Sequence, residues 1–132
     1  MDGDVSDPDS MVAFLDSIAD PSECTLIRTA ALISIQGQAG DTLRAVNVGG
    51  VRAILNLCAR YGRCRLVHVS SVHAISEAPG RTVMTEPDHH DPKDIVGGYA
   101  KTRAKAAQMV LDAARFGAVD AVVVYPSGII GP

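Results

Sequence analysis

The side chains best suited to chemistry in this chain are hydroxyls and a cation at the ends of predicted elements. Ser70 and Ser71 end the mostly apolar run 65–69, which has the pattern of a buried strand. Tyr99 begins a later helical segment, and Arg103 follows it by four residues. In open parallel sheets, ligands bind outside the carboxyl ends of the strands. We therefore expect Ser71, Tyr99 and Arg103 to face one crevice.

This trio is suited to moving a proton. Tyr99 can act as acid or base, while Ser71 holds the oxygen of a substrate by a hydrogen bond. Arg103 lies one helical turn from Tyr99 on nearly the same face, and a cation there lowers the pKa of a phenol. The bland alternatives are that the two serines only cap a loop and that Arg103 is a solvated helix charge.

Further short motifs accompany these residues in a fixed order. Together they resemble the extended short-chain dehydrogenase/reductases, the NAD-dependent epimerase/dehydratase group, and most of all its 3β-hydroxysteroid dehydrogenase-like and dihydroflavonol reductase-like members. The matching segments are 3–7 (GDVSD), 30–31 (AA), 47–50 (NVGG), 70–71 (SS), 99–102 (YAKT) and 126–132 (PSGIIGP).

The resemblance implies an NAD(P)-dependent oxidoreductase or a sugar epimerase/dehydratase, with NAD or NADP as cofactor. The implied catalytic residues are Ser71, Tyr99, Arg103 and Asn47, and His73 would line the substrate pocket. The implied cofactor-binding residues are Asp4, Val5, Ala30, Ala31, Ser70, Tyr99, Arg103, Pro126, Ser127 and Gly128. The implied substrate is a small molecule such as a sugar nucleotide, a steroid-like compound or another alcohol or carbonyl, and the implied assembly is a homodimer.

The chain departs from the family pattern at several points. Arg103 stands where the family has the lysine of its Tyr-x-x-x-Lys motif, and the two cations are not interchangeable at a tight site. Arg28 stands at a usual histidine, and Tyr125 at a usual arginine. The sequence holds no GxxGxxG turn, the usual binding site of the dinucleotide pyrophosphate. We therefore expect a fragment that is inactive alone; the alternative is a truncated, non-catalytic remnant or partner-binding module.

Other residues have plain structural interpretations. Asp4 could be a surface turn residue, and the alanine pair could be ordinary packing. His68 alternates within its strand and is interpreted as a tolerated polar residue of one face. The doublet His89–His90 lies in a loop without an obvious third ligand, so we expect no metal. The three cysteines are interpreted as buried small hydrophobes.

Composition narrows the class of protein. The chain has 132 residues, 47% of them hydrophobic, which suits one globular domain. Its net charge of −3 and its lack of a Lys/Arg run argue against nucleic-acid binding. Its acidic beginning has no apolar signal core, and no apolar run reaches the ~20 residues that span a bilayer. Three cysteines without a CxxC motif favour a reducing, cytoplasmic setting.

Periodicity predicts alternating helices and strands. This order predicts an α/β fold, a partial doubly wound parallel sheet of the Rossmann type that lacks its first βαβ segment. We expect residues 1–132 to form one partial NAD(P)-binding domain. The predicted helices are 8–18, 41–61 and 99–115, the predicted strands are 24–31, 65–70 and 119–125, and 72–98 is a long connection.

Overall fold

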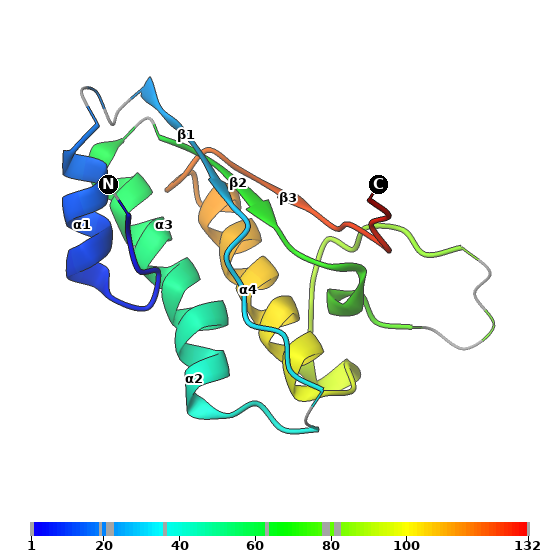
Figure 1. Ribbon diagram of the computed structural model, residues 1–132. Coiled ribbons are helices and arrows are strands. Elements are labelled where there is room, and N and C mark those ends of the chain that lie inside the picture. Colours follow the sequence, from blue (N-terminus) through cyan, green and yellow to red (C-terminus); the bar gives the residue numbers. More distant parts are fainter. Residues whose placement is uncertain are drawn as a thin grey trace.

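A parallel three-stranded sheet organises the chain in the computed structural model, which describes residues 2–18, 20, 23–35, 37–62, 64–77, 80 and 83–131. The strands are β1 (Thr25–Arg28), β2 (Arg65–Val69) and β3 (Ala121–Val124), in the order β1-β2-β3. The helices are α1 (Pro8–Asp16), α2 (Asp41–Arg44), α3 (Gly50–Tyr61) and α4 (Gly98–Arg115), and they alternate with the strands along the chain (Figure 1). The predicted α/β architecture of the Rossmann type is confirmed.

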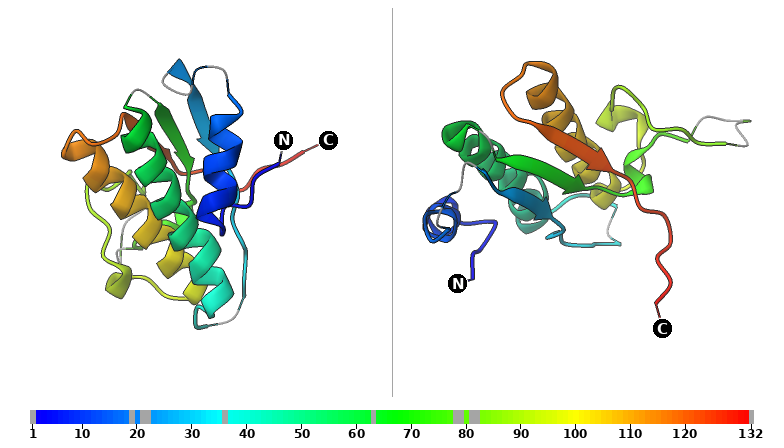
Figure 2. Two further views of the ribbon diagram at one scale, coloured as in Figure 1. Left: turned by 90° about the vertical axis from the view of Figure 1, so that its left-hand side faces the viewer. Right: turned by 90° about the horizontal axis from the view of Figure 1, so that it is seen from above.

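Helices α3 and α4 lie side by side on one face of the sheet (Figure 2). Alternation along the strands decides which side chains face them, because successive residues of a strand point to opposite faces. Leu66 and His68 are fully buried on the helix side, whereas Ile27 and Val122 are 65% and 47% exposed on the other side. Among the described residues, the helices therefore cover one face of the sheet.

The core fills the space between the sheet and the helices. Its apolar side chains come from every layer, and helix α1 closes it by packing on α3. The small residues of α4 let that helix approach closely, since Ala104 and Ala107 are completely buried. The largest fully buried apolar side chains are Leu15, Val51, Ile54, Leu66 and Val110.

Local signals set most element ends. Asp7 caps α1 by accepting a hydrogen bond from the Asp9 amide, and Pro8 occupies the first helical position. Gly62 ends α3 in the left-handed conformation with φ +76°, which costs glycine little. The predicted helix 41–61 is continuous but contains a π-helical turn, Ala45–Gly49, between α2 and α3.

The first strand is shorter than predicted. The prediction was 24–31, but ladder pairing stops at Arg28. Beyond that point the backbone amide and carbonyl of Leu32 both bond the side chain of Asn47, each at 2.9 Å, instead of a neighbouring strand. The connection 72–98 contains two 3-10 turns, Val72–Ala74 and Pro92–Asp94. No helix of the described residues combines the length and apolar character needed to cross a membrane.

Candidate active site

The carboxyl end of β2 meets the first turn of α4. Ser71 caps the 3-10 turn that follows β2, and its Oγ accepts a hydrogen bond from the His73 amide at 3.2 Å. The His73 ring stands edge-on to the half-buried ring of Tyr99, with centroids 6.3 Å apart and planes at 69°. The fold therefore brings Ser71, His73 and Tyr99 into one neighbourhood, as their sequence positions predicted.

Arg103 lies beneath this neighbourhood. Its Cζ is 5.9 Å from the centroid of the Tyr99 ring, within the range of a cation–π contact. Its Nη2 donates to the carbonyl of Val69, the last residue of β2. The side chain is only 2% exposed, so the interpretation of Arg103 as a solvated helix charge is wrong. Burial lowers the pKa of this guanidinium, because removal from water disfavours the charged form.

Two more basic side chains lie in the same buried layer. Arg28 is 2% exposed, and its Nη2 donates to the carbonyl of Val46 at 2.9 Å. Burial, followed by repulsion from Arg103, lowers the pKa of Arg28 to about 10. His68 pairs with Arg28 across the sheet, and burial plus the two guanidiniums lowers its pKa to about 3. The interpretation of His68 as a tolerated polar face residue is wrong, because it is neutral and fully buried.

Asn47 joins the helices below the site. Its side chain is completely buried in the π-helical turn, and its Nδ2 donates to Thr102 Oγ1 at 3.1 Å as well as to Leu32. Thr102 Oγ1 in turn donates to the carbonyl of Tyr99 at 2.7 Å. A polar chain therefore runs from the segment after β1, through Asn47, to the backbone of Tyr99. Such π turns are frequent at functional sites.

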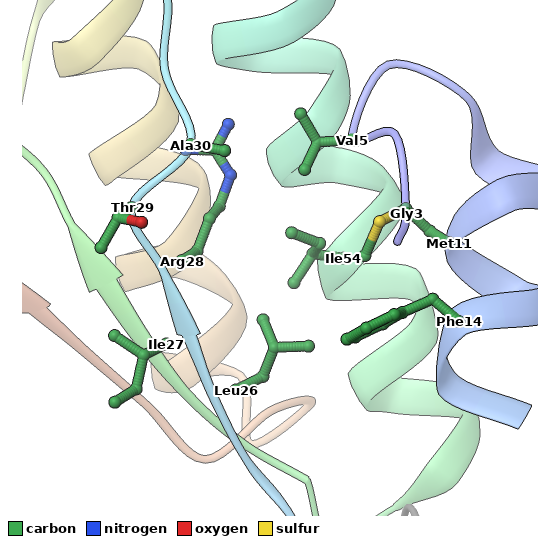
Figure 3. Close-up of a pocket in the computed structure, with 10 residues that line it drawn as sticks. All are labelled: Gly3, Val5, Met11, Phe14, Leu26, Ile27, Arg28, Thr29, Ala30 and Ile54. Atoms are coloured by element: carbon green, nitrogen blue, oxygen red, sulfur yellow. The ribbon is translucent and has the colours of Figure 1, made fainter. Parts of the chain in front are cut away.

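A separate pocket opens at the carboxyl end of β1. It has a volume of about 190 Å³ and lies between β1, α3 and the start of the chain. In Figure 3, Leu26, Phe14 and Ile54 gather on its apolar side, while Val5 faces Ala30 and Arg28 across its mouth. Asp4 and Ala30 line an adjoining open hollow. Three residues expected to hold the cofactor, Asp4, Val5 and Ala30, therefore come together here.

Asp4 is organised by its own turn. Its Oδ1 accepts hydrogen bonds from the amide and the hydroxyl of Ser6, at 2.8 and 2.7 Å. These bonds lower the pKa of the Asp4 carboxyl, because they favour its charged form. The carboxylate is fully exposed, so a ligand in the hollow can reach it.

Gly50 allows the backbone at Val5, which lines this pocket, to contact helix α3 closely. A Cβ atom on Gly50 would lie 2.8 Å from the carbonyl oxygen of Val5 and 3.4 Å from Arg28 Nη2. Real Cβ atoms essentially never approach backbone oxygen that closely, so only glycine allows the turn at 4–6 to rest on α3. The glycine of the NVGG motif thereby links the helix that carries Asn47 to the pocket that Val5 lines.

The remaining residues that the sequence predicts for the site follow the carboxyl ends of the three strands. Ser70 is 4% exposed, and its Oγ has no partner among the described residues. The carbonyl of Pro126 accepts from the amide of Val72 at 3.2 Å, which brings the end of β3 beside the serines. Ser127 and Gly128 continue from there as exposed chain, and Ala31 is half-buried after β1. Pro132 lies outside the described residues.

Sequence reasoning missed a hydrogen-bonded pair, buried His90 and half-buried Tyr125. His90 Nδ1 lies 2.9 Å from the carbonyl of Ala74, so it must carry the proton, and Nε2 accepts from the Tyr125 hydroxyl at 2.7 Å. Burial lowers the pKa of His90 and, followed by repulsion from Glu86, raises that of Tyr125 to about 12. This hydrogen bond joins the connection 72–98, which contains His90, to the residue that follows β3. Two sequence signals touched this pair, the His89–His90 doublet and the tyrosine at position 125 in place of the usual arginine, but neither indicated that the two side chains would meet.

Together the parallel sheet, the Tyr–Ser neighbourhood and the pocket at the carboxyl ends of the strands define a Rossmann-type α/β protein. The model of the 3-beta hydroxysteroid dehydrogenase/isomerase family matches residues 1–132. The chain therefore belongs to this family, which confirms the resemblance to the extended short-chain dehydrogenase/reductases.

Two curated proteins and one solved structure are similar to the chain, the structure in its fold. A putative dihydroflavonol 4-reductase of Synechocystis is 34% identical over 108 residues, or 81% of this chain and 31% of the relative. Sterol demethylase protein B of Methylococcus capsulatus is 32% identical over 108 residues, or 81% and 32% of the two chains. A short-chain dehydrogenase/reductase superfamily protein from Agrobacterium tumefaciens, solved with bound NAD, is 24% identical with a TM-score of 0.73, and the match covers 93% of this chain and 35% of that one. The chain spans about a third of the length of the curated relatives it matches.

Proposed function

We propose that residues 1–132 carry the acid–base half and the adenine-side pocket of an NAD(P)-dependent oxidoreductase or epimerase/dehydratase. The observation that carries this proposal is the neighbourhood of Ser71, Tyr99 and Arg103 at the carboxyl end of β2. Family membership supports it, because these residues stand in the family's order. The chain forms one partial NAD(P)-binding domain in this proposal.

Each residue has a defined task. Tyr99 exchanges a proton with the oxygen of a substrate hydroxyl or carbonyl, and Ser71 donates a hydrogen bond to the same oxygen. Ser71 is free to donate, because its bond with the His73 amide uses only a lone pair. Arg103 places a positive charge below the Tyr99 ring, at cation–π distance, and so helps to hold the ring in place. The nicotinamide, when bound, supplies or accepts the hydride.

The pocket at β1 fits the adenine end of such a cofactor. It joins apolar walls, which suit a flat aromatic ring, to the exposed Asp4 carboxylate, which can accept from an exocyclic amine. Val5 and Ala30 are small enough to leave that space open. The sequence itself provides no glycine-rich turn for the pyrophosphate, so these residues alone hold the cofactor by one end.

The substrate is a small-molecule alcohol or carbonyl compound, and His73 lines its site. The exposed ring of His73 stands beside Tyr99, where a substrate oxygen would approach. The relatives' names point to ring compounds, a sterol and a dihydroflavonol. Formation of a homodimer stays a prediction.

The second candidate is a non-catalytic member of the same fold that binds a partner. Two observations favour it: Arg103 is turned into the core instead of toward the crevice, and the uncovered sheet face exposes Ile27 and Val122. The two candidates differ in one property, because only the first needs a site that recognises a nucleotide.

The experiment is a titration of this chain with AMP and with NAD. We expect AMP to bind weakly, with a dissociation constant on the order of 1 mM, and NAD to bind no more than about tenfold tighter, because no turn holds the pyrophosphate. Asp4→Ala should weaken AMP, whereas Asp9→Ala, an exposed carboxylate on α1, should not. Absence of AMP binding, or binding that Asp4→Ala leaves unchanged, would support the non-catalytic candidate.

A further inference from the structure

Two cysteines stand side by side at the beginnings of neighbouring strands. Cys24 precedes β1 and Cys64 precedes β2, and the parallel register pairs the next residues, Thr25 and Arg65. The Arg65 amide donates to the carbonyl of Cys24 at 3.0 Å, which fixes the two backbones together. The two Sγ atoms are 2.9 Å apart. The interpretation of these cysteines as ordinary small hydrophobes is therefore incomplete.

The backbone geometry at this position suits a covalent link. Adjacent strands lie about 4.8 Å apart, and a disulfide needs Cα atoms about 4.4–6.8 Å apart with both Cβ atoms on one side. Register partners in a parallel pair point to the same face of the sheet. Oxidation of Cys24 and Cys64 therefore requires rotation of side chains but no shift of the strands.

We propose that Cys24 and Cys64 form an oxidisable pair that closes to an intramolecular disulfide by exchange with a low-molecular-weight disulfide such as oxidised glutathione. The Cys24 thiolate attacks one glutathione sulfur, forms a mixed disulfide and releases one glutathione thiolate. The Cys64 thiolate then attacks Cys24 Sγ and releases the second. The two protons of the cysteine thiols pass to the two released thiolates, so two cysteines are oxidised and one glutathione disulfide is reduced.

Exposure decides which cysteine reacts first. Cys24 is half-buried, whereas Cys64 and Cys58 are each only 2% exposed, so an oxidant in solution meets Cys24. Cys58, on α3, also contacts the Cys64 thiol and is the competing partner. It lies in the core and is far less exposed than Cys24, so Cys24 starts the exchange. Burial raises the pKa of Cys24 to about 11, so the reaction is slow at neutral pH.

The link would lie at the amino ends of the strands, on the opposite edge of the sheet from Tyr99. It would close a loop between positions 40 residues apart and so restrict the unfolded chain. Oxidation is therefore expected to stabilise the fold without touching the candidate active site. This inference does not depend on the proposed function.

The test incubates the purified chain with oxidised glutathione at a pH of about 8.5, where a larger fraction of Cys24 is thiolate than at neutral pH. We expect loss of two of the three thiols, a decrease of intact mass by about 2 Da, and a melting temperature raised by roughly 10 °C. Peptide mapping should find Cys24 joined to Cys64. Cys58→Ser is the matched control and should still form the link, whereas Cys24→Ser should not.

Mapping of the wild-type chain decides the outcome even if a variant fails to fold. Three thiols that stay free would overturn the proposal, as would a stable mixed disulfide on Cys24 without closure. A Cys58–Cys64 link or a disulfide between two chains would overturn it as well, because in either case Cys24 and Cys64 of one chain are not the cysteines that pair.

Discussion

Asn47 shows how one side chain can replace part of a sheet. Its amide group makes both hydrogen bonds that a neighbouring strand would make to Leu32, and a third to Thr102 on α4. Asparagine is unfavourable inside a helix, and the resemblance already implied a role for Asn47 in the site. The sequence did not reveal which groups the amide would satisfy, since Leu32 and Thr102 become neighbours only after the helices pack.

Replacement of Asn47 by alanine should therefore be costly. Asn47→Ala removes the buried bond to Thr102 Oγ1 and leaves the part-buried amide and carbonyl of Leu32 without this partner, and we expect a loss of about 2–4 kcal/mol in the free energy of unfolding. Asn56→Ala is the control, because Asn56 is exposed on α3. Urea denaturation measures both. Equal small losses for the two variants would show that the bonds of Asn47 are not structural.

At the scale of elements, the turn at 4–6 rests on α3 only because Gly50 lacks a side chain. Gly50→Ala should push Val5 away, destabilise the chain and weaken AMP binding by about tenfold or more. Gly49→Ala is the matched control: its Cβ would meet only Arg44 O at 3.9 Å, and alanine favours a helix by roughly 0.5–1 kcal/mol over glycine. Thermal melting and AMP titration test this pair, and a Gly50→Ala variant as stable as Gly49→Ala would contradict the account.

The sequence predicted the helices and strands better than it predicted which side chains meet when they pack. The predicted helix start at residue 8 and the predicted helix end at residue 61 are confirmed, because local chemistry sets them: Asp7 caps the first helix and Gly62 ends the second. His68 was misinterpreted because alternation separates two faces but does not say which one the helices cover. Arg103 was predicted to face the crevice, whereas Val69 holds its guanidinium inside the core through a carbonyl that the sequence could not place.

At the scale of the whole molecule, the buried basic layer makes stability depend on pH. His68 is neutral in the folded chain, because burial and repulsion from Arg28 and Arg103 lower its pKa from 6.5 to about 3. Between about pH 6.5 and pH 3, His68 is protonated in the unfolded chain but stays neutral in the folded chain. The free energy of unfolding therefore decreases as the pH decreases from about 6.5 toward 3. The folded pKa of His90 is also lowered, so it acts in the same direction.

We expect His68 to contribute up to about 2 kcal/mol of the stability lost between pH 7 and pH 5. His68→Leu should remove that part of the dependence, while His89→Gln, which changes an exposed imidazole, should keep it. Chemical denaturation at several pH values measures the slope. A His68→Leu slope equal to that of the wild type would show that His68 is not held neutral by its surroundings.

In the proposed function, Tyr99 moves the proton at the carboxyl ends of the strands. The most direct measurement is turnover of NADPH with a dihydroflavonol in a chimaeric enzyme, in which this chain replaces its matching segment in the Synechocystis relative. We expect Tyr99→Phe to decrease turnover by about 100-fold or more, because general acid catalysis is lost, while Tyr61→Phe, a half-buried control at the end of α3 away from the site, has no effect. A chimaera that is active and keeps its full turnover with Tyr99→Phe would contradict the assignment.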